Sequence, residues 1–376
     1  MRNMKIAMFG HKRIPSREGG VEIVVEELAL RLVELGNQVV CYNRRRKQYD
    51  REYDFNGIKI KSVPTLDRKG LAAVSSSFFA AILSAIGDYD IVHIHAEGPA
   101  FFAWIPKLFN KKIIVTIHGL DWQREKWRGR FGSWFIQKGE VNAVKYADEI
   151  IVLSENMKEY FKKKYNRNTH FIPNGVNLPE VRKADQIEQL YSIKKDGYIL
   201  FLGRLVPEKG ISYLIDSFLE VNTNMKLVIA GGSSDTPEYE REIKNKAKKD
   251  SRIIFTGFVQ GSLLEELYSN AYLYVLPSDL EGMPLSLLEA MSYGNCCLVS
   301  DIKELTEVVE DKGVIFSQGD ITALTNKLQN LCDHPEVVKK YKKDVENFIC
   351  EKYNWNSITN KTLELYEQTR KPALKN

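Results

Sequence analysis

The sequence predicts an α/β protein made of two doubly wound, Rossmann-like domains. Short β-rich runs alternate with helical patterns in each half of the chain, and the alternation restarts after a polar, turn-rich stretch. A length of 376 residues also exceeds what one ordinary core organises. Because open α/β sheets bind ligands beyond the carboxyl ends of their strands, we expect the functional residues there, in a cleft between the domains.

The first half opens with a hydrophobic run that predicts a buried strand, and a long helical pattern follows it. Strand and helix then alternate to about residue 164, as a parallel sheet requires. The expected strands are Lys5–Phe9, Gln38–Cys41, Ile58–Ser62, Ile91–Ile94, Ile113–Ile117 and Glu149–Leu153, and the expected helices are Gly20–Leu35, Leu71–Ile86 and Ser154–Lys164.

The second half repeats this rhythm. The expected strands are Tyr198–Leu202, Lys226–Ala230, Ile253–Thr256, Leu273–Leu276, Cys296–Ser300 and Gly313–Phe316, and the expected helices are Ile211–Val221, Pro237–Lys248, Ser262–Ser269, Pro284–Tyr293, Ile302–Val309 and Asp320–Leu331. We therefore expect an N-terminal domain over residues 1–178, a linker over 179–195 and a C-terminal domain over 196–350. Residues 351–376 are expected to form a helix that packs back on the N-terminal domain.

Composition indicates a soluble protein of a reducing compartment. Hydrophobic residues make up 44% of the chain and charged residues 27%, and the five cysteines show no disulfide or metal spacing. The apolar run Leu71–Gly87 contains four serines, so we expect a buried helix rather than a membrane span. No signal peptide is expected. No metal is expected either, because the sequence Asp88-Tyr89-Asp90 precedes a strand and is interpreted as a turn.

Positive charge is concentrated in the first half. Residues 1–180 contain 29 Lys and Arg against 20 Asp and Glu, whereas residues 181–376 contain 25 against 29. Segment 122–135 interleaves aromatic residues with cations, and Arg44-Arg45-Arg46-Lys47 adds a basic cluster. Such a surface suits an anionic membrane, with core packing and single-stranded nucleic acid as the alternatives.

Three groups in the first half are candidates for a binding site. Gly19 and Gly20 lie between the first strand and the first long helix, where glycine lets a ligand approach free backbone N–H groups; a tight turn is the alternative. His118, followed by Asp121, ends one expected strand, and His95 ends another. Histidine there can act through a ring nitrogen, although a lone histidine is commonly structural.

In the second half, residues 203–210 follow the first strand of the domain and include Arg204 and Lys209. Two cations on a loop that enters a helix suit a diphosphate, although a solvated loop would look the same. Farther along, Glu281 and Glu289 stand eight positions apart, the first in a loop and the second within a helix. Two acids at different depths can bind the hydroxyl groups of one elongated ligand.

Taken together and in this order, these motifs resemble the retaining glycosyltransferases of family 4, which have the GT-B fold, over essentially the whole chain. The opening from Gly10 to Leu28 further resembles a bacterial subgroup that builds capsule and cell-wall polysaccharides and includes rhamnosyltransferases. The resemblance implies a metal-independent transfer from a nucleotide sugar, UDP- or dTDP-linked, without a cofactor. It also implies a lipid-linked saccharide acceptor and a peripheral position on the inner face of the cell membrane.

The resemblance also implies a role for each site residue. Arg204 and Lys209 would hold the diphosphate of the donor in place of a metal. Glu289 would bind the ribose and Glu281 the donor sugar, with His118 beside that sugar. The other implied contacts are Gly203, Met283, Pro284, Leu285, Phe258 and Val259 for the donor, and Gly19, Gly20, His95 and Asp121 for the acceptor or phosphate.

Two other functions are compatible with parts of the sequence. A non-hydrolysing sugar-nucleotide epimerase shares the GT-B architecture, but the arrangement around Glu281 and Glu289 argues against it. A basic nucleic-acid-binding protein would need a recognised binding module, and the cations here are dispersed, so no nucleic-acid partner is expected. The sequence leaves the oligomeric state open.

Overall fold

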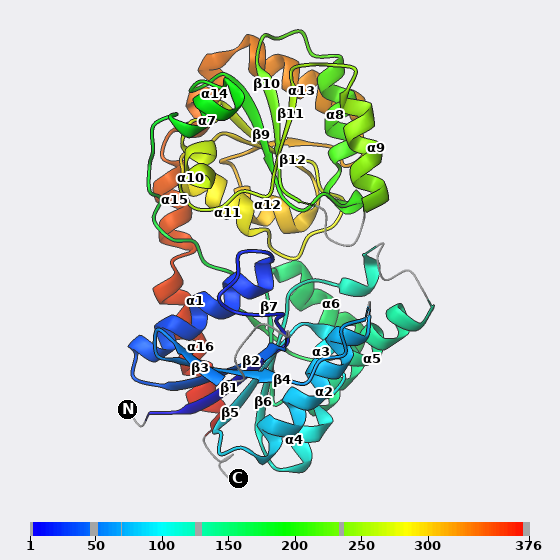
Figure 1. The fold of residues 1–376 in the computed structure, drawn as a ribbon, viewed down its shortest axis with the longest axis vertical. Coiled ribbons are helices and arrows are strands. Elements are labelled where there is room, and N and C mark those ends of the chain that lie inside the picture. The colour runs from blue at the N-terminus through cyan, green and yellow to red at the C-terminus, as the bar shows by residue number, and fades with distance from the viewer. Residues whose placement is uncertain (1–2, 46–51, 69, 125–129, 233–236, 371–376) are drawn as a thin grey trace. The chain divides into compact units, whose positions relative to one another are not determined.

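The computed structural model describes residues 3–45, 52–68, 70–124, 130–232 and 237–370. The chain divides into two compact units: unit 1 comprises Met1–Asn174 with Trp355–Asn376, and unit 2 comprises Gly175–Asn354. Each unit is built on a sheet with helices around it (Figure 1), and nearly all neighbouring strands are parallel. The predicted α/β class with two Rossmann-like domains is therefore confirmed.

Unit 1 contains an eight-stranded sheet of order β3-β4-β2-β1-β5-β6-β7-β8, in which only β3 is antiparallel to its neighbour. The strand order reverses between β1 and β5, so the loops after these two strands open at one switch point. The strands are β1 (Lys5–Phe9), β2 (Gln38–Arg44), β3 (Glu52–Phe55), β4 (Ile58–Val63), β5 (Ile91–His95), β6 (Lys112–Ile117), β7 (Glu149–Val152) and β8 (His170–Phe171).

Helices cover the sheet of unit 1, and the last helix of the chain is one of them. Tyr366 of this helix, α16, is fully buried, and its hydroxyl lies 2.6 Å from His93 Nδ1 on β5. The helices are α1 (Gly20–Glu34), α2 (Leu71–Ile86), α3 (Glu97–Ala100), α4 (Trp104–Leu108), the 3-10 turn η1 (Asp121–Gln123), α5 (Arg130–Tyr146), α6 (Glu155–Tyr165) and α16 (Trp355–Arg370).

Helix α2 corrects the expectation of a buried helix over Leu71–Gly87. It turns small residues such as Ser77 and Ala81 inward, where they are buried, whereas Phe78 and Phe79 are each 37% exposed. Small side chains let the helix approach the sheet closely, and its large apolar side chains are left outside. Within the described ranges, no helix combines the length and the apolar character needed to cross a membrane.

Unit 2 contains a six-stranded parallel sheet of order β11-β10-β9-β12-β13-β14, with its switch point between β9 and β12. The strands are β9 (Tyr198–Leu202), β10 (Lys226–Ala230), β11 (Ile253–Gly257), β12 (Leu273–Leu276), β13 (Cys297–Ser300) and β14 (Val314–Phe316). The helices are α7 (Gln186–Tyr191), the 3-10 turn η3 (Pro207–Lys209), α8 (Ile211–Leu219), α9 (Pro237–Ala247), α10 (Ser262–Ser269), α11 (Leu285–Ser292), α12 (Lys303–Val309), α13 (Ile321–Asp333), α14 (Pro335–Lys342) and α15 (Val345–Lys352).

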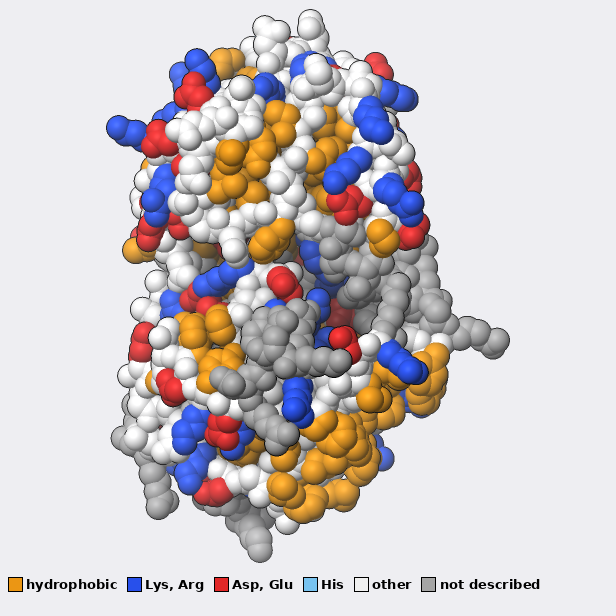
Figure 2. Space-filling model, viewed as in Figure 1, with side chains coloured by type: hydrophobic (Ala, Val, Ile, Leu, Met, Phe, Trp, Pro, Cys, Tyr) orange, Lys and Arg blue, Asp and Glu red, His pale blue; other side chains and the backbone are white. Residues whose placement is uncertain are grey.

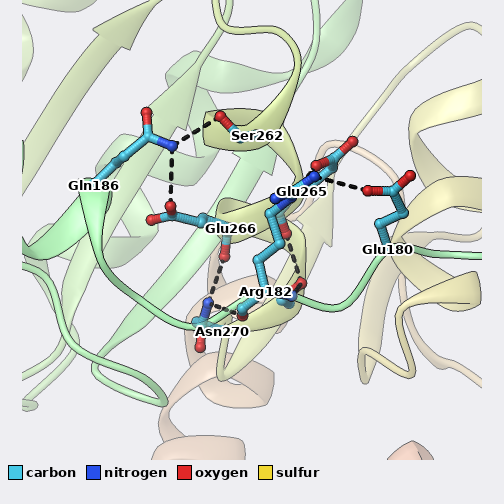
Figure 3. A network of polar contacts seen from close by, with 8 residues as sticks. Glu180, Arg182, Gln186, Ser262, Glu265, Glu266 and Asn270 are labelled. Carbon is cyan, nitrogen blue, oxygen red and sulfur yellow. Dashed lines mark hydrogen bonds and ion pairs between the residues drawn. The ribbon is translucent and has the colours of Figure 1, made fainter.

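Segment 179–195, expected to be a linker, contains α7 and is bonded to α10 within unit 2. Figure 3 shows the polar network that joins them. Arg182 forms an ion pair with Glu265, and the buried carboxylate of Glu266 accepts a hydrogen bond from Gln186 Nε2 at 3.1 Å. These contacts make the segment part of the body of unit 2.

All five cysteines carry free thiols, as their spacing predicts. Cys332 is half-buried and the others are buried. Burial raises the pKa of the Cys296 thiol to about 12 and also raises the pKa of the Cys41 thiol. The thiols are therefore protonated at neutral pH.

Candidate active site

Two loops of unit 2 meet at the switch point between β9 and β12. Residues 203–210 follow β9, and residues 277–284 follow β12. Gly210 has a φ of +66°, and a Cβ on it would lie 1.9 Å from the carbonyl oxygen of Pro277. Only glycine permits this approach, so Gly210 is what lets the two loops pack together.

Lys209 and Glu281 form an ion pair across these loops. Lys209 Nζ lies 2.5 Å from Glu281 Oε1, which also accepts a hydrogen bond from Ser278 Oγ at 2.6 Å. The side chains of Lys209 and Glu281 are only 11% and 7% exposed, so solvent screens their attraction weakly. Arg204 is half-buried in the same loop, directly after Gly203.

Glu289 lies in the second turn of α11 and is oriented by a residue that the sequence analysis missed. Tyr268 of α10 is buried, and its hydroxyl donates a hydrogen bond to Glu289 Oε2 at 2.9 Å. Burial raises the pKa of the Tyr268 phenol well above its usual value, so the hydroxyl remains a donor. Tyr268 also stacks on Tyr293, with ring centroids 5.3 Å apart. The carboxylate of Glu289 is therefore held in one orientation by protein contacts.

The other predicted donor residues surround the start of α11 and the end of β11. Met283 and Pro284 are buried, and Leu285 begins α11, where the backbone N–H groups of Leu287 and Leu288 donate to the carbonyl oxygen of Pro284. Phe258 is 53% exposed and Val259 is buried, both directly after β11. Because β10 lies between β11 and β9, Phe258 and Val259 are one strand removed from the Arg204 loop.

In unit 1, three histidines lie on or directly after two neighbouring strands: His93 in the middle of β5, His95 at its carboxyl end and His118 directly after β6. The ring centroids of His93 and His95 are 4.1 Å apart, and His95 Nδ1 lies 3.1 Å from His118 Nε2. Burial lowers the pKa of His93 to about 3 and that of His118 to about 4, and it also lowers the pKa of His95. All three rings are therefore neutral at neutral pH, and a neutral ring offers one donor and one acceptor nitrogen.

The glycine loop before α1 is packed against a carboxylate of that helix, Glu22, which the sequence did not single out. Buried Glu22 folds back, and its Oε1 accepts a hydrogen bond from the backbone N–H of Lys12 at 2.7 Å. A Cβ on Gly19 would lie 2.1 Å from Glu22 Oε2, so glycine is needed for this fold-back. Gly20 begins α1 at the same point. Burial lowers the pKa of His11 to about 4, and the charge of Glu22 opposes that effect.

Asp121 lies beyond the carboxyl end of β6, three positions after His118. Its carboxylate forms an ion pair with Arg124 at 3.0 Å, and its backbone N–H donates a hydrogen bond to Glu97 Oε2 at 2.9 Å. Both the charge and the backbone of Asp121 are thus fixed. Glu97 was also missed by the sequence analysis.

The aspartates of the Asp88-Tyr89-Asp90 sequence lie before β5, at the end of the strand opposite His95. Asp88 pairs with Lys5 Nζ at 2.6 Å, and Asp90 accepts a hydrogen bond from the backbone N–H of Lys5 at 2.8 Å. Among the residues that the structure describes, no three His, Cys, Asp or Glu side chains are grouped so that they could hold a metal ion.

Two protein families match the chain one after the other. Residues 18–180 match Glycosyltransferase Family 4, and residues 182–348 match Glycosyl transferases group 1. An uncharacterized glycosyltransferase of Methanocaldococcus jannaschii is 26% identical over 396 residues, covering 97% of this chain and 98% of that protein. The UDP-Gal:alpha-D-GlcNAc-diphosphoundecaprenol alpha-1,3-galactosyltransferase of Escherichia coli is 28% identical over 298 residues, covering 74% of this chain and 75% of that protein.

A solved structure shares the fold over nearly the whole length. The Anabaena protein HepE in complex with UDP-glucose superposes with a TM-score of 0.81 at 16% identity, covering 97% of this chain and 100% of that one. At this level of identity the likeness establishes the architecture, two Rossmann-like domains of the GT-B type. It does not establish the reaction, which has to be inferred from the residues of the site.

Proposed function

We propose that this chain, a glycosyltransferase of the GT-B fold that joins a family 4 domain to a group 1 domain, moves a sugar with retention of configuration from a nucleotide sugar to a lipid-linked glycan acceptor. The observation that carries the proposal is the meeting of the Arg204 loop with Glu281 at the switch point of unit 2. The name of the Escherichia coli relative, which includes a diphosphoundecaprenol, supports a lipid-linked acceptor. We place the product in capsule or cell-wall polysaccharide, with UDP-sugars and dTDP-rhamnose as leading donors.

On the donor side, Arg204 and Lys209 bind the diphosphate. Breaking the bond between sugar and diphosphate develops negative charge on the leaving phosphate, and fixed cations stabilise that state more than the ground state. The ammonium of Lys209 is held in place by its ion pair with Glu281. The carboxylate of Glu281 can also accept a hydrogen bond from a sugar hydroxyl. At the start of α11, the backbone N–H groups of Leu285 and Ser286, which precede the first hydrogen bonds of the helix, point to the same phosphate.

Residues from two different elements bind the nucleoside. Glu289, oriented by Tyr268, accepts hydrogen bonds from the ribose hydroxyls. The exposed ring of Phe258 packs on the base, and the backbone at Val259 hydrogen-bonds its edge. Each of these contacts comes from a strand end or from the helix that follows one, as in other open α/β sheets.

The acceptor side lies in unit 1. Neutral His118, supported by His95, accepts or donates a hydrogen bond to the reacting sugars, and Asp121 and the loop at Gly20 orient the acceptor. Retention follows from attack on the same face as the leaving group, with the departing phosphate oxygen taking the proton of the acceptor hydroxyl. This assignment keeps His118 as a positioning contact and needs no carboxylate nucleophile.

We assign the membrane contact to an apolar face of unit 1 formed by exposed side chains of α2, α4 and α5. Figure 2 shows hydrophobic side chains gathered over this part of the unit. Ring contacts join them, with centroids 5.5 Å apart for Phe78 and Phe79 and 5.9 Å apart for Phe131 and Trp134. An apolar face of this kind suits the boundary of a bilayer. Its members are Phe78, Phe79, Trp104, Leu108, Phe109, Phe131 and Trp134.

This face replaces much of the basic aromatic surface expected over residues 122–135. Trp122 turns inward, and its indole N–H donates a hydrogen bond to the buried carboxylate of Glu140 at 3.2 Å. Residues 125–129 lie outside the described residues, as do Arg46 and Lys47 of the expected basic cluster. Exposed Arg45 remains a candidate for contact with anionic headgroups.

A thermal-shift panel of UDP, GDP, dTDP and ADP tests the donor assignment. One nucleotide at a hundredfold excess over its Kd should stabilise the chain by about 2.7 kcal/mol. Glu289→Ala should weaken that nucleotide, whereas Glu242→Ala, at an exposed position of α9, should leave it unchanged. Stabilisation by none of the four would contradict the proposal, and turnover of a nucleotide sugar without an acceptor would favour an epimerase.

A further inference from the structure

Unit 1 contains a pair of buried acids, Glu97 and Glu140, behind the Asp121 loop. Glu97 begins α3 directly after β5, Glu140 lies on α5, and both have 0% exposure. The two helices touch through their backbones, because a Cβ on Gly139 would lie 1.9 Å from the carbonyl oxygen of Glu97. The two acids are therefore held together by the packing of α3 on α5.

Glu140 is surrounded by hydrogen-bond donors. Its Oε1 accepts hydrogen bonds from Tyr160 at 2.9 Å, from Lys164 Nζ at 2.8 Å and from the hydroxyl of Tyr165. Its Oε2 accepts one from the indole N–H of Trp122. Although burial opposes ionisation, the donors led by Lys164 hold the pKa of Glu140 below its usual value, so Glu140 is the charged member of the pair.

Glu97 is in the opposite situation. Its Oε2 accepts the backbone N–H of Asp121, but no N–H or O–H donor of the described residues reaches its buried Oε1. Burial raises the pKa of Glu97 well above its usual value, and the charges of Asp121 and Glu140 raise it further. A proton on Glu97 itself would satisfy this oxygen, as the donor of a hydrogen bond to the carboxylate of Glu140.

We propose that Glu97 and Glu140 share this one proton and act as a positioning pair that fixes residues 121 and 122 for the acceptor. Glu97 accepts a hydrogen bond from the backbone N–H of Asp121, and Glu140 accepts one from the indole N–H of Trp122. The pair therefore binds two consecutive residues of one loop. The role in acceptor binding rests on the proposed function, in which Asp121 orients the acceptor. The shared proton itself does not.

The charged groups around the pair determine how it responds to pH. Asp121 adds a negative charge on one side, balanced by its ion pair with Arg124, and Lys164 of α6 supplies the positive charge opposite Glu140. Because the pKa of Glu97 is raised in the folded chain, the stabilisation that protonated Glu97 contributes is complete at low pH and is lost as pH rises through that pKa. The pKa of Glu140 is lowered, so the stabilisation that its carboxylate contributes is present above its ordinary pKa and is lost as pH falls through the lowered one. Ionised Glu97 would face Glu140 as a second buried negative charge, and the loop would loosen.

Glu97→Gln and Glu97→Ala separate the shared proton from bulk packing. A glutamine amide can donate to Glu140 and its carbonyl can accept from Asp121, so it reproduces the protonated acid without titrating. We expect Glu97→Ala to raise the KM for the acceptor about tenfold or more, because a loosened loop misplaces the acceptor. Glu97→Gln should keep the acceptor KM within about threefold of wild type and should extend activity to higher pH. Both variants should bind the nucleoside diphosphate normally, since that site lies in unit 2.

Infrared spectroscopy supplies a measurement that does not depend on turnover. Wild type at neutral pH should show the carbonyl band of a buried protonated carboxylic acid, and Glu97→Gln should lack it. Absence of the band in wild type, or an equal loss of acceptor affinity in both variants, would overturn the proposal. Presence of the band with no transfer from any nucleotide sugar would instead refute the proposed function and leave the proton-sharing pair intact.

Discussion

We propose that transition-state stabilisation depends, at the residue scale, on the ion pair between Lys209 and Glu281. Lys209→Ala removes a fixed cation beside the leaving phosphate and should lower kcat about 10²- to 10³-fold. It also leaves the carboxylate of Glu281 buried without its cation, which is destabilising. Steady-state kinetics and thermal unfolding of the same variant separate the two effects.

Lys248→Ala is the matched control for Lys209→Ala. Lys248 is an exposed lysine of unit 2, and its ammonium donates a hydrogen bond to nearby Asn245. Its replacement should leave both kcat and stability near wild type. A Lys209→Ala enzyme with normal kcat would show that the leaving group is stabilised elsewhere.

In the proposed donor site, the hydroxyl of Tyr268 orients the carboxylate of Glu289 that would bind the ribose. Tyr268→Phe keeps the ring and its stacking on Tyr293 but removes the hydroxyl that donates to Glu289. The loss of one charge-assisted hydrogen bond, about 1.5 kcal/mol, should weaken the best nucleoside diphosphate about tenfold by calorimetric titration. The loss should be smaller for a nucleotide whose ribose lacks the hydroxyl that Glu289 binds.

Tyr272→Phe provides the control for Tyr268→Phe. Tyr272 is also buried, but its hydroxyl donates to the backbone carbonyl of Leu331 at 2.7 Å, away from Glu289. It should lower stability without changing nucleotide affinity. Equal affinities for wild type and Tyr268→Phe would mean that the tyrosine has no part in ribose binding.

At the scale of elements, α2 presents its large apolar side chains to solvent. Phe78→Ser with Phe79→Ser removes two aromatic rings from the apolar face, each of which would contribute about 1.5–3 kcal/mol on burial in a bilayer. Sedimentation with anionic lipid vesicles should show a loss of binding of about tenfold or more. Leu35→Ser is the control, because Leu35 is an exposed apolar residue of unit 1 at the end of α1. Equal binding of the double variant and wild type would rule out this face.

The elements differ in how well the sequence predicts them. The central strands and helices such as α11 follow from hydrophobic periodicity, because burial on both faces of a parallel sheet leaves continuous apolar runs. Strand β3 was missed, since Glu52–Phe55 is short, polar and at the edge of its sheet. Helix α5 was missed because its apolar and charged residues were interpreted as one surface rather than as two faces of a helix.

The orientation of α2 could not be predicted by hydrophobicity alone. The composition of Leu71–Gly87 suggested burial, but which side of a helix is buried depends on the neighbours it meets. Only small side chains such as Ala and Ser fit where α2 lies close to the sheet, so tertiary packing leaves the larger apolar side chains on the outer face of the helix.

At the scale of the whole molecule, the chain returns to unit 1 to complete its core with α16. Deleting residues 355–376 removes the buried side chains Trp355, Leu365 and Tyr366 and leaves His93 without its tyrosine partner. Three such side chains account for roughly 5–9 kcal/mol of burial, comparable with the whole stability of a domain. Calorimetry should show that unit 1 no longer unfolds cooperatively, whereas the nucleotide should still stabilise unit 2.

Gln368→Ala, at an exposed position of α16, is the control for this truncation. It should retain the unfolding transition of wild type. A truncated chain that also retained the transition of unit 1 would show that α16 is dispensable for the fold.

The sequence predicts those parts of the candidate site that residues close together in the chain form. It does not predict the parts that depend on contacts between distant elements. Arg204 and Lys209 lie in the segment that follows β9. Glu281 lies in the loop after β12 and Glu289 in the helix α11 that follows it, so order along the chain brings each pair together. Tyr268 lies 21 positions from Glu289, and Glu97 lies 24 positions from Asp121. Such supporting contacts depend on the packing of separate elements, which no local pattern records.

The thiols of this chain make it a convenient subject for site-specific labelling. Because four cysteines are buried and the fifth is half-buried with its thiol protonated, none presents a reactive thiolate to solvent at neutral pH. A single cysteine placed at position 79 on α2 would then be the preferred target of a thiol-reactive fluorophore. Such a probe would report directly whether that helix meets lipid while the enzyme turns over.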